Sequence, residues 1–389
     1  MTEVASTQSE RLQSAVAKHR RFWERTEADS CLRSVSVYAP SVGVKLPQPD
    51  GGYVTEAALL EPDMVDPAAL IDEVEQWDAE RLDGTLTAQG QFMISVGQGD
   101  LMPGSRPFPK LPWIEAMLGC PVKMTEGQIW NEHYPGDPRE VVERSIRFEG
   151  NPWFELYLEC LRQLQSRLAQ RFPVSANTLL RGTSDLAAAV MGVQEACLGW
   201  IEDPDFMARL MRVCTDAVLT VVEAGHTTLE PFVGGYLSNY RIWAPAPVVS
   251  TQADHSTLVS PQMYEEQMLP YDLEVIGACP LSIFHLHNNG LHIAPLLVEI
   301  PDLDVIEVAM DPYPTGERKR YEVEMLRMIL ERKPLILDVH LPSLEEAEWL
   351  LGQLPNRGLC WHPLYDPEIY DKLSPSEVGH ETWILGGSD

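Results

Sequence analysis

Basic side chains are scarce in this chain. Its 389 residues include 29 Lys and Arg against 58 Asp and Glu, which gives a formal net charge of −29 at pH 7. This excess of acid disfavours nucleic acids and anionic membrane surfaces as partners, because like charges repel. Hydrophobic residues still make up 44% of the chain, which is enough for a folded protein with a buried core.

Long apolar runs are missing as well. No segment approaches the roughly 18 consecutive apolar residues of a membrane span. The beginning of the chain, with Glu3, Ser6 and Glu10, has no apolar signal stretch. We therefore expect a cytoplasmic protein without a membrane segment.

Paired cysteines and glycine-rich phosphate loops are absent too. The seven cysteines are an odd number, widely spaced, with no C-x-x-C pair, so we expect most of them to be reduced packing residues. Neither G-x-G-x-x-G nor G-x-x-x-x-G-K-[ST] occurs. The sequence therefore gives no support for a nucleotide cofactor.

Capping residues mark the starts of several predicted helices. They are Asn151-Pro152, Asp203-Pro204 and Ser260-Pro261, with Ser343 and Glu346 at capping-box spacing before a further helix. Pro270 should kink or end the third of these helices. Residues 8–28 combine charge with scattered apolar positions and predict an amphipathic helix near the N-terminus.

Short apolar runs alternate with these helices and predict buried parallel strands. There are eight: Val35–Tyr38, Phe92–Val96, Thr178–Leu180, Val248–Thr251, Leu281–Phe284, Val305–Val308, Leu335–Val339 and Leu359–Trp361. Eight such strands suggest an α/β fold of the (β/α)8 TIM-barrel type. We expect one domain over 1–389, with an N-terminal helical extension at 1–30 and an irregular cover at 40–150. A run near Phe232–Tyr236 is interpreted as a decorating loop, and Val122–Trp130 as a hairpin.

Polar residues concentrate where these strands end. In a TIM barrel, the carboxyl ends of the strands lie at one end of the barrel, and the catalytic and binding residues are found there. Five of the ten histidines are at these positions, which hold Arg181, Gln252, Asp254, His255, His285, His287, Asn288, Glu307, Asp338, His340, Cys360 and His362. Such a concentration indicates an active site.

His285 and His287 are the most informative pair. Alternate residues of a strand point the same way, so both imidazoles can face one metal ion. The later strands add Glu307, Cys360 and His362, which would complete a zinc site of nitrogen, sulfur and oxygen ligands. The alternative is that His285 is an interior histidine with its hydrogen bonds satisfied, and His287 a substrate contact.

Cys360 has two interpretations. It lies two residues before His362 and would supply a thiolate if zinc is bound; otherwise it is a small buried hydrophobe. A cysteine nucleophile activated by His362 is disfavoured, because two residues on one face of a strand do not by themselves place a base at the sulfur.

The remaining mouth residues suit substrate binding and proton transfer. Arg181 can hold a substrate carboxylate, or it can pair with Asp185 four residues later. Gln252, His255 and Asn288 are further candidates for substrate contacts. Asp254, Asp338 and His340 are candidates for acid–base chemistry, although the two aspartates can equally serve as loop caps or orient a histidine.

Aromatic residues gather in the two decorating segments. They are Trp130, Tyr134, Tyr236, Tyr240 and Trp243. Trp130 and Tyr240 in particular can roof a pocket for a flat or apolar substrate. The alternative is that the whole group forms the core of an added layer.

Read together, several segments resemble the uroporphyrinogen decarboxylase superfamily. They are Trp113–Cys120 with the later Trp130, Arg181–Leu186, Ser260–Tyr264 with Pro270-Tyr271, the F-H-L-H-N-N-G segment, and Asp304-Val305. The resemblance covers about residues 20–370. It implies a TIM barrel whose site lies at the carboxyl-terminal mouth, and one of two chemistries: decarboxylation without a cofactor, or zinc-dependent methyl transfer involving corrinoid proteins.

The details favour the methyl-transfer branch. Authentic haem-pathway decarboxylases carry an R-Q-A-G-R-Y motif after the first strand, whereas Val35–Gly43 has no arginine. The methyltransferase branch has H-x-C after the fifth strand and a cysteine on the eighth. His285 matches that histidine, His287 stands where the first cysteine would be, and Cys360 falls near the second.

The sequence therefore supports a ranked set of functions. The first is a zinc-dependent methyltransferase or demethylase acting on a small substrate with a corrinoid protein as partner. The second is a metal-independent decarboxylase or lyase (a carboxy-lyase), with Arg181 holding the substrate acid. The third is a binding protein that kept the barrel and lost its chemistry. The oligomeric state stays open, a homodimer included.

Overall fold

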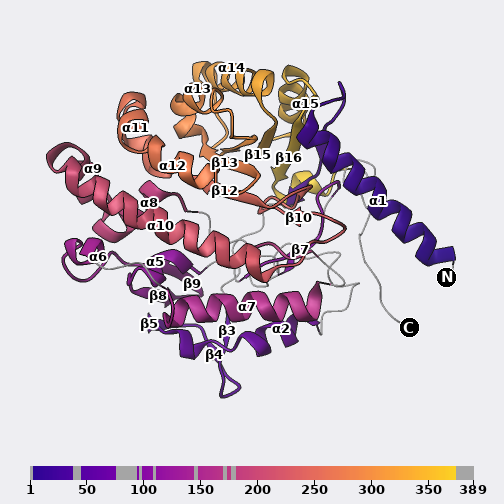
Figure 1. The fold of residues 1–389 in the computed structure, drawn as a ribbon. Helices are drawn as coiled ribbons and strands as arrows, with labels where there is room; N and C mark the ends of the chain where they lie inside the picture. The colour runs from indigo at the N-terminus through magenta and orange to yellow at the C-terminus, as the bar shows by residue number, and fades with distance from the viewer. Residues whose placement is uncertain are drawn as a thin grey trace.

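The structure is a computed structural model that describes residues 3–37, 45–75, 94–95, 99–107, 111–143, 148–169, 173–176 and 181–373. Its centre is a parallel sheet in the order β1-β16-β15-β14-β13-β12, with β2 also paired to β16 (Figure 1). The strands are β1 (Leu32–Arg33), β2 (Ser36–Val37), β12 (Val248–Gln252), β13 (Leu281–His287), β14 (Val305–Met310), β15 (Leu335–His340) and β16 (Leu359–Tyr365). The protein is thus of mixed α/β class, as expected.

Six of the eight predicted strands lie in this sheet, and the first is next to the last, as a barrel requires. The prediction Thr178–Leu180 falls outside the described residues. In the described residues the sheet ends at β12, so a closed barrel stays a prediction.

The run Phe92–Val96 differs from its prediction. Its described part, β6 (Ile94–Ser95), pairs antiparallel with β7 (Gly104–Ser105) in a separate ribbon. Gly99 takes a φ of +58°, and a Cβ there would lie 2.3 Å from the Arg33 carbonyl oxygen. Glycine at this position therefore lets the chain turn back close to β1, which a pattern of apolar residues does not reveal.

The helices follow the predicted caps. Asn151 and Asp203 accept backbone N–H groups at the starts of α7 (Pro152–Leu168) and α10 (Pro204–Thr228), and Ser260 and Ser343 do so for α11 (Pro261–Gln267) and α15 (Leu344–Gln353). Pro270 lies in the first turn of α12 (Leu269–Ile276), so the predicted break is confirmed. The other helices are α1 (Glu3–Glu24), α2 (Pro67–Glu75), α5 (Trp113–Met117), α6 (Arg139–Glu143), α8 (Thr183–Met191), α9 (Val193–Glu202), α13 (Ala294–Leu297), α14 (Gly316–Arg332) and α16 (Pro367–Tyr370).

The region predicted as an irregular cover contains short elements. β5 (Ala57–Leu60), β8 (Val122–Thr125) and β9 (Gln128–Asn131) form a small antiparallel sheet that includes the predicted hairpin, and β3 (Leu46–Pro47) pairs with β4 (Tyr53–Val54). The helix α7 packs against α2, α5 and α10. In Figure 1 this group lies below the parallel sheet, while α13, α14 and α15 lie above it.

The segment around 232–244 forms its own ribbon. β10 (Tyr236–Leu237) pairs antiparallel with β11 (Trp243–Ala244), apart from the parallel sheet. The interpretation of Phe232–Tyr236 as a decorating loop is therefore confirmed.

Side-chain alternation along the parallel strands creates two distinct faces. One face packs against the helices through residues such as Phe284, Ile306 and Leu337. On the other face an apolar layer is formed by Leu32, Val248, Ile283, Val305, Ile336 and Cys360, together with Phe22 of α1. Two residues further along each strand, the same face carries polar side chains: Ser250, His285, Glu307, Asp338 and His362.

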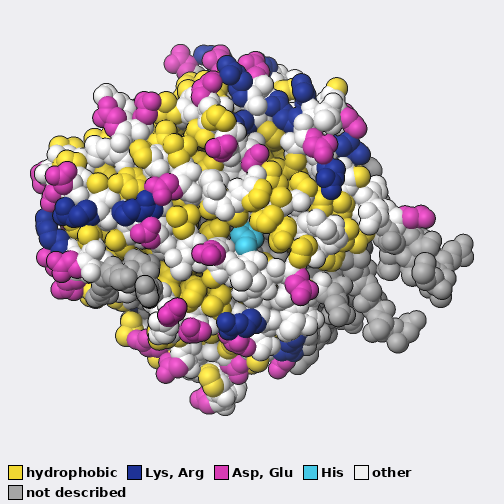
Figure 2. Space-filling view, viewed as in Figure 1, with side chains coloured by type: hydrophobic (Ala, Val, Ile, Leu, Met, Phe, Trp, Pro, Cys, Tyr) yellow, Lys and Arg dark blue, Asp and Glu magenta, His cyan; other side chains and the backbone are white. Residues whose placement is uncertain are grey.

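Acidic side chains are spread across the face of the molecule in Figure 2, whereas Lys and Arg form a few small groups. This distribution agrees with the net charge of −29. Of the helices in the described ranges, none combines the length and apolar character that crossing a bilayer requires.

Candidate metal centre and its surroundings

Three polar side chains meet at the carboxyl ends of β12 and β13. Asp254 opens a 3-10 turn (Asp254–Leu258) two residues after β12, and His285 and His287 lie at the end of β13. One ligand atom from each lies within 4.8 Å of the other two. Nε2 of His285 and Nε2 of His287 are each 3.9 Å from Oδ1 of Asp254.

The environment of Asp254 fits a cation. Its Oδ2 accepts a hydrogen bond of 2.8 Å from Nε2 of Gln252, whereas its buried Oδ1 has no hydrogen-bond partner among the described residues. A buried carboxylate oxygen without a partner is rare, because it loses its hydration without compensation. Zinc–ligand bonds are about 2.1 Å long, so one ion can contact this oxygen and both imidazoles.

His285 is held from behind by a buried carboxylate. Its Nδ1 is hydrogen-bonded to Oε2 of Glu307, which is 1% exposed, and the Tyr240 hydroxyl donates to the same oxygen at 3.2 Å. This contact fixes the ring so that Nε2 remains on the side of Asp254. Glu307, predicted as a metal ligand, is instead the hydrogen-bond partner of His285 and lies outside the candidate metal-ligand group of the described residues. Carboxylates in this position are common behind histidine ligands at metal sites.

Burial and neighbouring charges shift the pKa values of His285 and Asp254. Burial lowers the pKa of His285, but Glu307, Asp254 and Asp338 outweigh it and raise the pKa to about 9. Burial also raises the pKa of Asp254, with a further increase from Asp185. The His285 shift therefore reflects neighbouring carboxylates, whereas the Asp254 shift comes first from burial. A bound divalent ion would favour the ionised form of Asp254 and the neutral form of His285.

Gln252 links this cluster to a second carboxylate. Its Nε2 donates at 2.8 Å to both Asp254 and Asp185, and Asp185 also accepts the backbone N–H groups of His255 and Gly182. A Cβ at Gly182 would lie 1.6 Å from the Gln252 carbonyl oxygen, so only glycine allows this close approach. These contacts favour a positioning role of Gln252 toward Asp254, and its predicted substrate contact stays a prediction.

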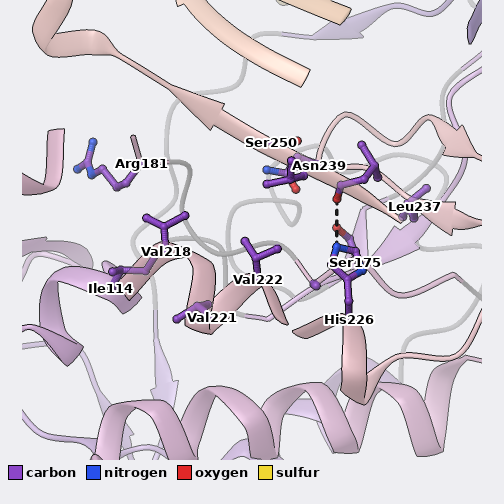
Figure 3. A pocket seen from close by; sticks show the side chains of 13 residues that line it. Ile114, Ser175, Arg181, Val218, Val221, Val222, His226, Leu237, Asn239 and Ser250 are labelled. Atoms are coloured by element: carbon purple, nitrogen blue, oxygen red, sulfur yellow. Dashed lines mark hydrogen bonds between the residues drawn. The ribbon is translucent and has the colours of Figure 1, made fainter. Parts of the chain in front are cut away.

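Arg181 contacts a carboxylate that the sequence did not predict, and its predicted role in holding a substrate carboxylate stays a prediction. Its Nε donates at 2.6 Å to Oε1 of Glu115, a buried residue of α5 that lies in the region predicted as irregular. Arg181 also lines a pocket with Asn239 and Ser250 on one side and Val218 and Val222 of α10 on the other (Figure 3).

A second polar group occupies the neighbouring strands. Nδ1 of His362 is 2.5 Å from Oδ1 of Asp338, its register partner, and Nε2 is 2.7 Å from Oγ of Ser36. His340 lies further along β15, with Nε2 3.2 Å from Oδ1 of Asp366. The metal-ligand group found among the described residues includes neither His362 nor His340.

Cys360 lies in the apolar layer. Its register partners are Leu32 and Ile336, it is 1% exposed, and burial raises the pKa of its thiol well above the ordinary value. A thiolate is the form that binds zinc. The structure therefore separates Cys360 from the two histidines and favours its interpretation as a small buried hydrophobe.

Three predicted substrate contacts have structural partners. Nδ2 of Asn288 donates to the Pro312 carbonyl and to Glu322 of α14. His255 is buried, with Nε2 3.8 Å from Sγ of Cys197. Trp130 lies on β9, where its Nε1 donates to Glu132 at 3.4 Å. These contacts favour positioning roles for Asn288 and His255 and a place in the small sheet for Trp130.

The aromatic group divides between core and cavity. Trp243 and Tyr134 are buried in hydrophobic clusters, as the core interpretation predicts. Tyr240 contacts Glu307 and lines a cavity beside the polar residues of β15 and β16. Sequence reasoning assigned Asp254 to proton transfer and missed its place in the candidate metal group with His285 and His287, although its position two residues beyond Gln252 was an available signal.

Comparison with known proteins gives a distant structural likeness. No family model matches the sequence, and no curated protein matches it either. Among solved structures, a methyltransferase from Methanosarcina mazei aligns over 87% of this chain and 92% of its own, with 13% sequence identity and a TM-score of 0.47. A likeness at this level supports no conclusion about the reaction of this chain.

Proposed function

We propose that this chain is an enzyme that uses a divalent cation, held by Asp254, His285 and His287, for methyl transfer to or from a small substrate. The observation that carries the proposal is the buried, unpartnered Oδ1 of Asp254, which lies 3.9 Å from Nε2 of both histidines. Two imidazoles and one carboxylate, with room for a further ligand, are typical of catalytic zinc sites. Zinc is therefore the cation we propose.

The protein residues around this site prepare it for binding. Glu307 fixes the ring of His285 and keeps its Nε2 toward Asp254, and Tyr240 holds Glu307 in turn. Gln252 occupies Oδ2 of Asp254 and leaves Oδ1 available. When bound, a zinc ion would act as a Lewis acid toward an oxygen, nitrogen or sulfur of the substrate.

Methyl transfer is the reaction we favour because of the sequence resemblance to the zinc-dependent branch described above. In such a transfer, the acceptor's electron pair forms the new bond to carbon, and the pair of the broken bond stays with the leaving heteroatom. We propose a corrinoid protein as the partner that carries the methyl group. His287, which stands at the cysteine position of that branch, gives this ligand set more nitrogen and less sulfur.

Metal-independent decarboxylation is the competing hypothesis. It relied on Arg181 to hold a substrate carboxylate, but this guanidinium donates to buried Glu115. Metal dependence separates the two reactions directly.

The test uses the full chain purified without a histidine tag. Small O-, N- and S-methylated compounds are offered together with cob(I)alamin as methyl acceptor, and demethylation is followed by mass spectrometry before and after chelation. The proposal predicts activity that chelation abolishes, that zinc restores, and that His287→Ala lacks. Demethylation by metal-free protein would overturn the metal's role, and release of CO2 from a carboxylated substrate without metal would select the decarboxylase.

A further inference from the structure

A serine, a histidine and an aspartate are hydrogen-bonded in series on three adjacent strands. Nδ1 of His362 on β16 lies 2.5 Å from Oδ1 of Asp338 on β15, and Nε2 of the same ring lies 2.7 Å from Oγ of Ser36 on β2. None of the three belongs to the candidate metal group of the described residues. They therefore form a separate group of side chains that the proposed function does not use.

The register of the strands holds these three side chains on one face of the sheet. His362 and Asp338 are register partners, and Ser36 pairs with Leu364, two residues beyond His362. Because alternate residues of a strand share a face, Ser36 lies on the same face as His362 and nearer the carboxyl ends of the strands. Parallel α/β folds bind their ligands at that end.

The two contacts of the imidazole fix the direction of its hydrogen bonds. A carboxylate oxygen of Asp338 accepts, so Nδ1 of His362 carries the proton and Nε2 of the neutral ring presents a lone pair. The hydroxyl of Ser36 therefore donates to Nε2. In this arrangement a histidine can take the proton of a serine nucleophile, while an aspartate holds the ring in the required tautomer.

A cavity of about 210 Å³ adjoins this group. Its lining includes the polar side chains of Asp338 and His362 and the apolar side chains of Ile336 and Cys360. Ser36 is 6% exposed, and its hydroxyl contacts the imidazole that lines the cavity. Since a cavity of about 150 Å³ can hold benzene, there is room beside this imidazole for a small acyl group.

We propose that Ser36, His362 and Asp338 form a nucleophilic triad that hydrolyses a small carboxylic ester. Oγ of Ser36 forms a bond to the acyl carbon while its proton passes to Nε2 of His362. The bond from the acyl carbon to the alcohol oxygen then breaks, its electron pair stays with that oxygen, and the alcohol leaves with the proton from Nε2.

Water completes the reaction. Its oxygen attacks the acyl carbon and its proton passes to Nε2 of His362. The bond between the acyl carbon and Oγ of Ser36 breaks, Oγ regains a proton from Nε2, and the carboxylic acid is released. Asp338 is a positioning residue in both steps. This activity goes beyond the proposed function and needs no metal.

The experiment detects the nucleophile by covalent modification. The full chain is incubated with a fluorophosphonate, whose phosphorus an activated serine attacks with loss of fluoride, and the modified residue is located by peptide mass spectrometry. We expect modification of Ser36 at the same rate with and without a chelator. Hydrolysis of p-nitrophenyl butyrate is measured in parallel, and Ser36→Ala should lose both the modification and the hydrolysis.

Further variants separate catalysis from structure. His362→Gln should slow the modification roughly 100-fold or more, the usual contribution of a general base. Asp338→Asn should also slow it, because an amide does not hold the required tautomer, and Asp338→Glu should recover part of the rate. Ser34→Ala is the matched control: this hydroxyl is also buried, two residues before Ser36, and has no hydrogen-bond partner among the described residues. It should react as the wild type does.

The inference is overturned if the wild type is not modified at Ser36, or if folded His362→Gln and Asp338→Asn react like Ser34→Ala. Circular dichroism shows which variants fold, and the wild type alone decides the first outcome. Zinc content measured on the same samples keeps the two hypotheses apart. Zinc binding without modification of Ser36 defeats this inference alone, and modification without zinc binding defeats the metal-dependent function alone.

Discussion

Glu307 and His285 are register partners on neighbouring strands, and Oε2 of Glu307 is hydrogen-bonded to Nδ1 of His285. The pairing of β13 with β14 therefore sets which side of the imidazole faces Asp254. Glu307 is almost completely buried, and burial raises the pKa of its carboxyl group. The histidine and Tyr240 satisfy this buried carboxylate, and it would make His285 a stronger ligand in the proposed metal centre.

The variant Glu307→Gln should lower zinc affinity roughly 10–100-fold, because the partner of the ligand loses its charge. Competition with a chelating dye measures the change. Glu322→Gln is the matched control, since Glu322 is an equally buried carboxylate that contacts Asn288 and Arg318 instead. Equal zinc affinities for the two variants would show that Glu307 does not support the metal site.

The variant Cys360→Ala should keep its zinc and lose stability. The thiol packs in the apolar layer, so removing it costs about 1 kcal/mol in the free energy of unfolding. Urea unfolding and metal analysis on the same preparation test both parts. Loss of zinc with unchanged stability would return Cys360 to the ligand set.

The variant Arg181→Gln should destabilise the fold, because Glu115 would keep a buried charge without its partner. The Arg181 side chain is 32% exposed. We therefore expect the free energy of unfolding to fall by about 2–3 kcal/mol, which is near or below the lower end of the cost of breaking a fully buried ion pair. Glu115→Gln combined with Arg181→Gln should lose less than the two single changes added together. Additive losses would mean that the pair is not coupled.

His19 predicts a dependence of stability on pH. Nε2 lies 2.7 Å from the Asp100 carbonyl oxygen, Nδ1 accepts the Trp243 backbone N–H, and burial lowers the pKa of the ring to about 4. Between the unfolded value of about 6.5 and about 4, the unfolded state binds more protons. The free energy of unfolding should therefore fall as the pH falls through this window, on the order of 3 kcal/mol in total.

Urea unfolding at several pH values measures this effect in the wild type and in His19→Gln. The variant should be less stable near neutral pH and should lose less stability on acidification. Parallel pH profiles for the two proteins would exclude His19 as the cause.

Local patterns predicted much of the fold. Six strands form where runs of apolar residues predicted them. The helix caps at Asn151 and Asp203 could be predicted because a cap depends on residues that are neighbours in the sequence. Part of the candidate site could also be predicted. Side chains alternate between the two faces of a strand, so His285 and His287 were expected on the same face of β13.

The features that the sequence did not predict depend on contacts between segments that are distant in the chain. Cys360 and His362 share a face, but the pairing of β16 with β1 and β15 decides that Cys360 lies beside Leu32 and Ile336 and that His362 lies beside Asp338. Arg181 is hydrogen-bonded to Glu115, which lies 66 residues earlier in the chain. A local sequence pattern does not predict a partner at this separation.

The most direct test of the metal centre is the zinc content of tag-free protein that has been loaded with zinc and dialysed. We predict about one zinc ion per chain in the wild type and in His292→Ala, whose ring nitrogens contact the carbonyl oxygens of Asn289 and Val259. Asp254→Asn and His287→Ala should retain little or none. A wild type that binds no zinc, or equal zinc in all four proteins, would contradict the assignment of Asp254, His285 and His287 as a metal centre.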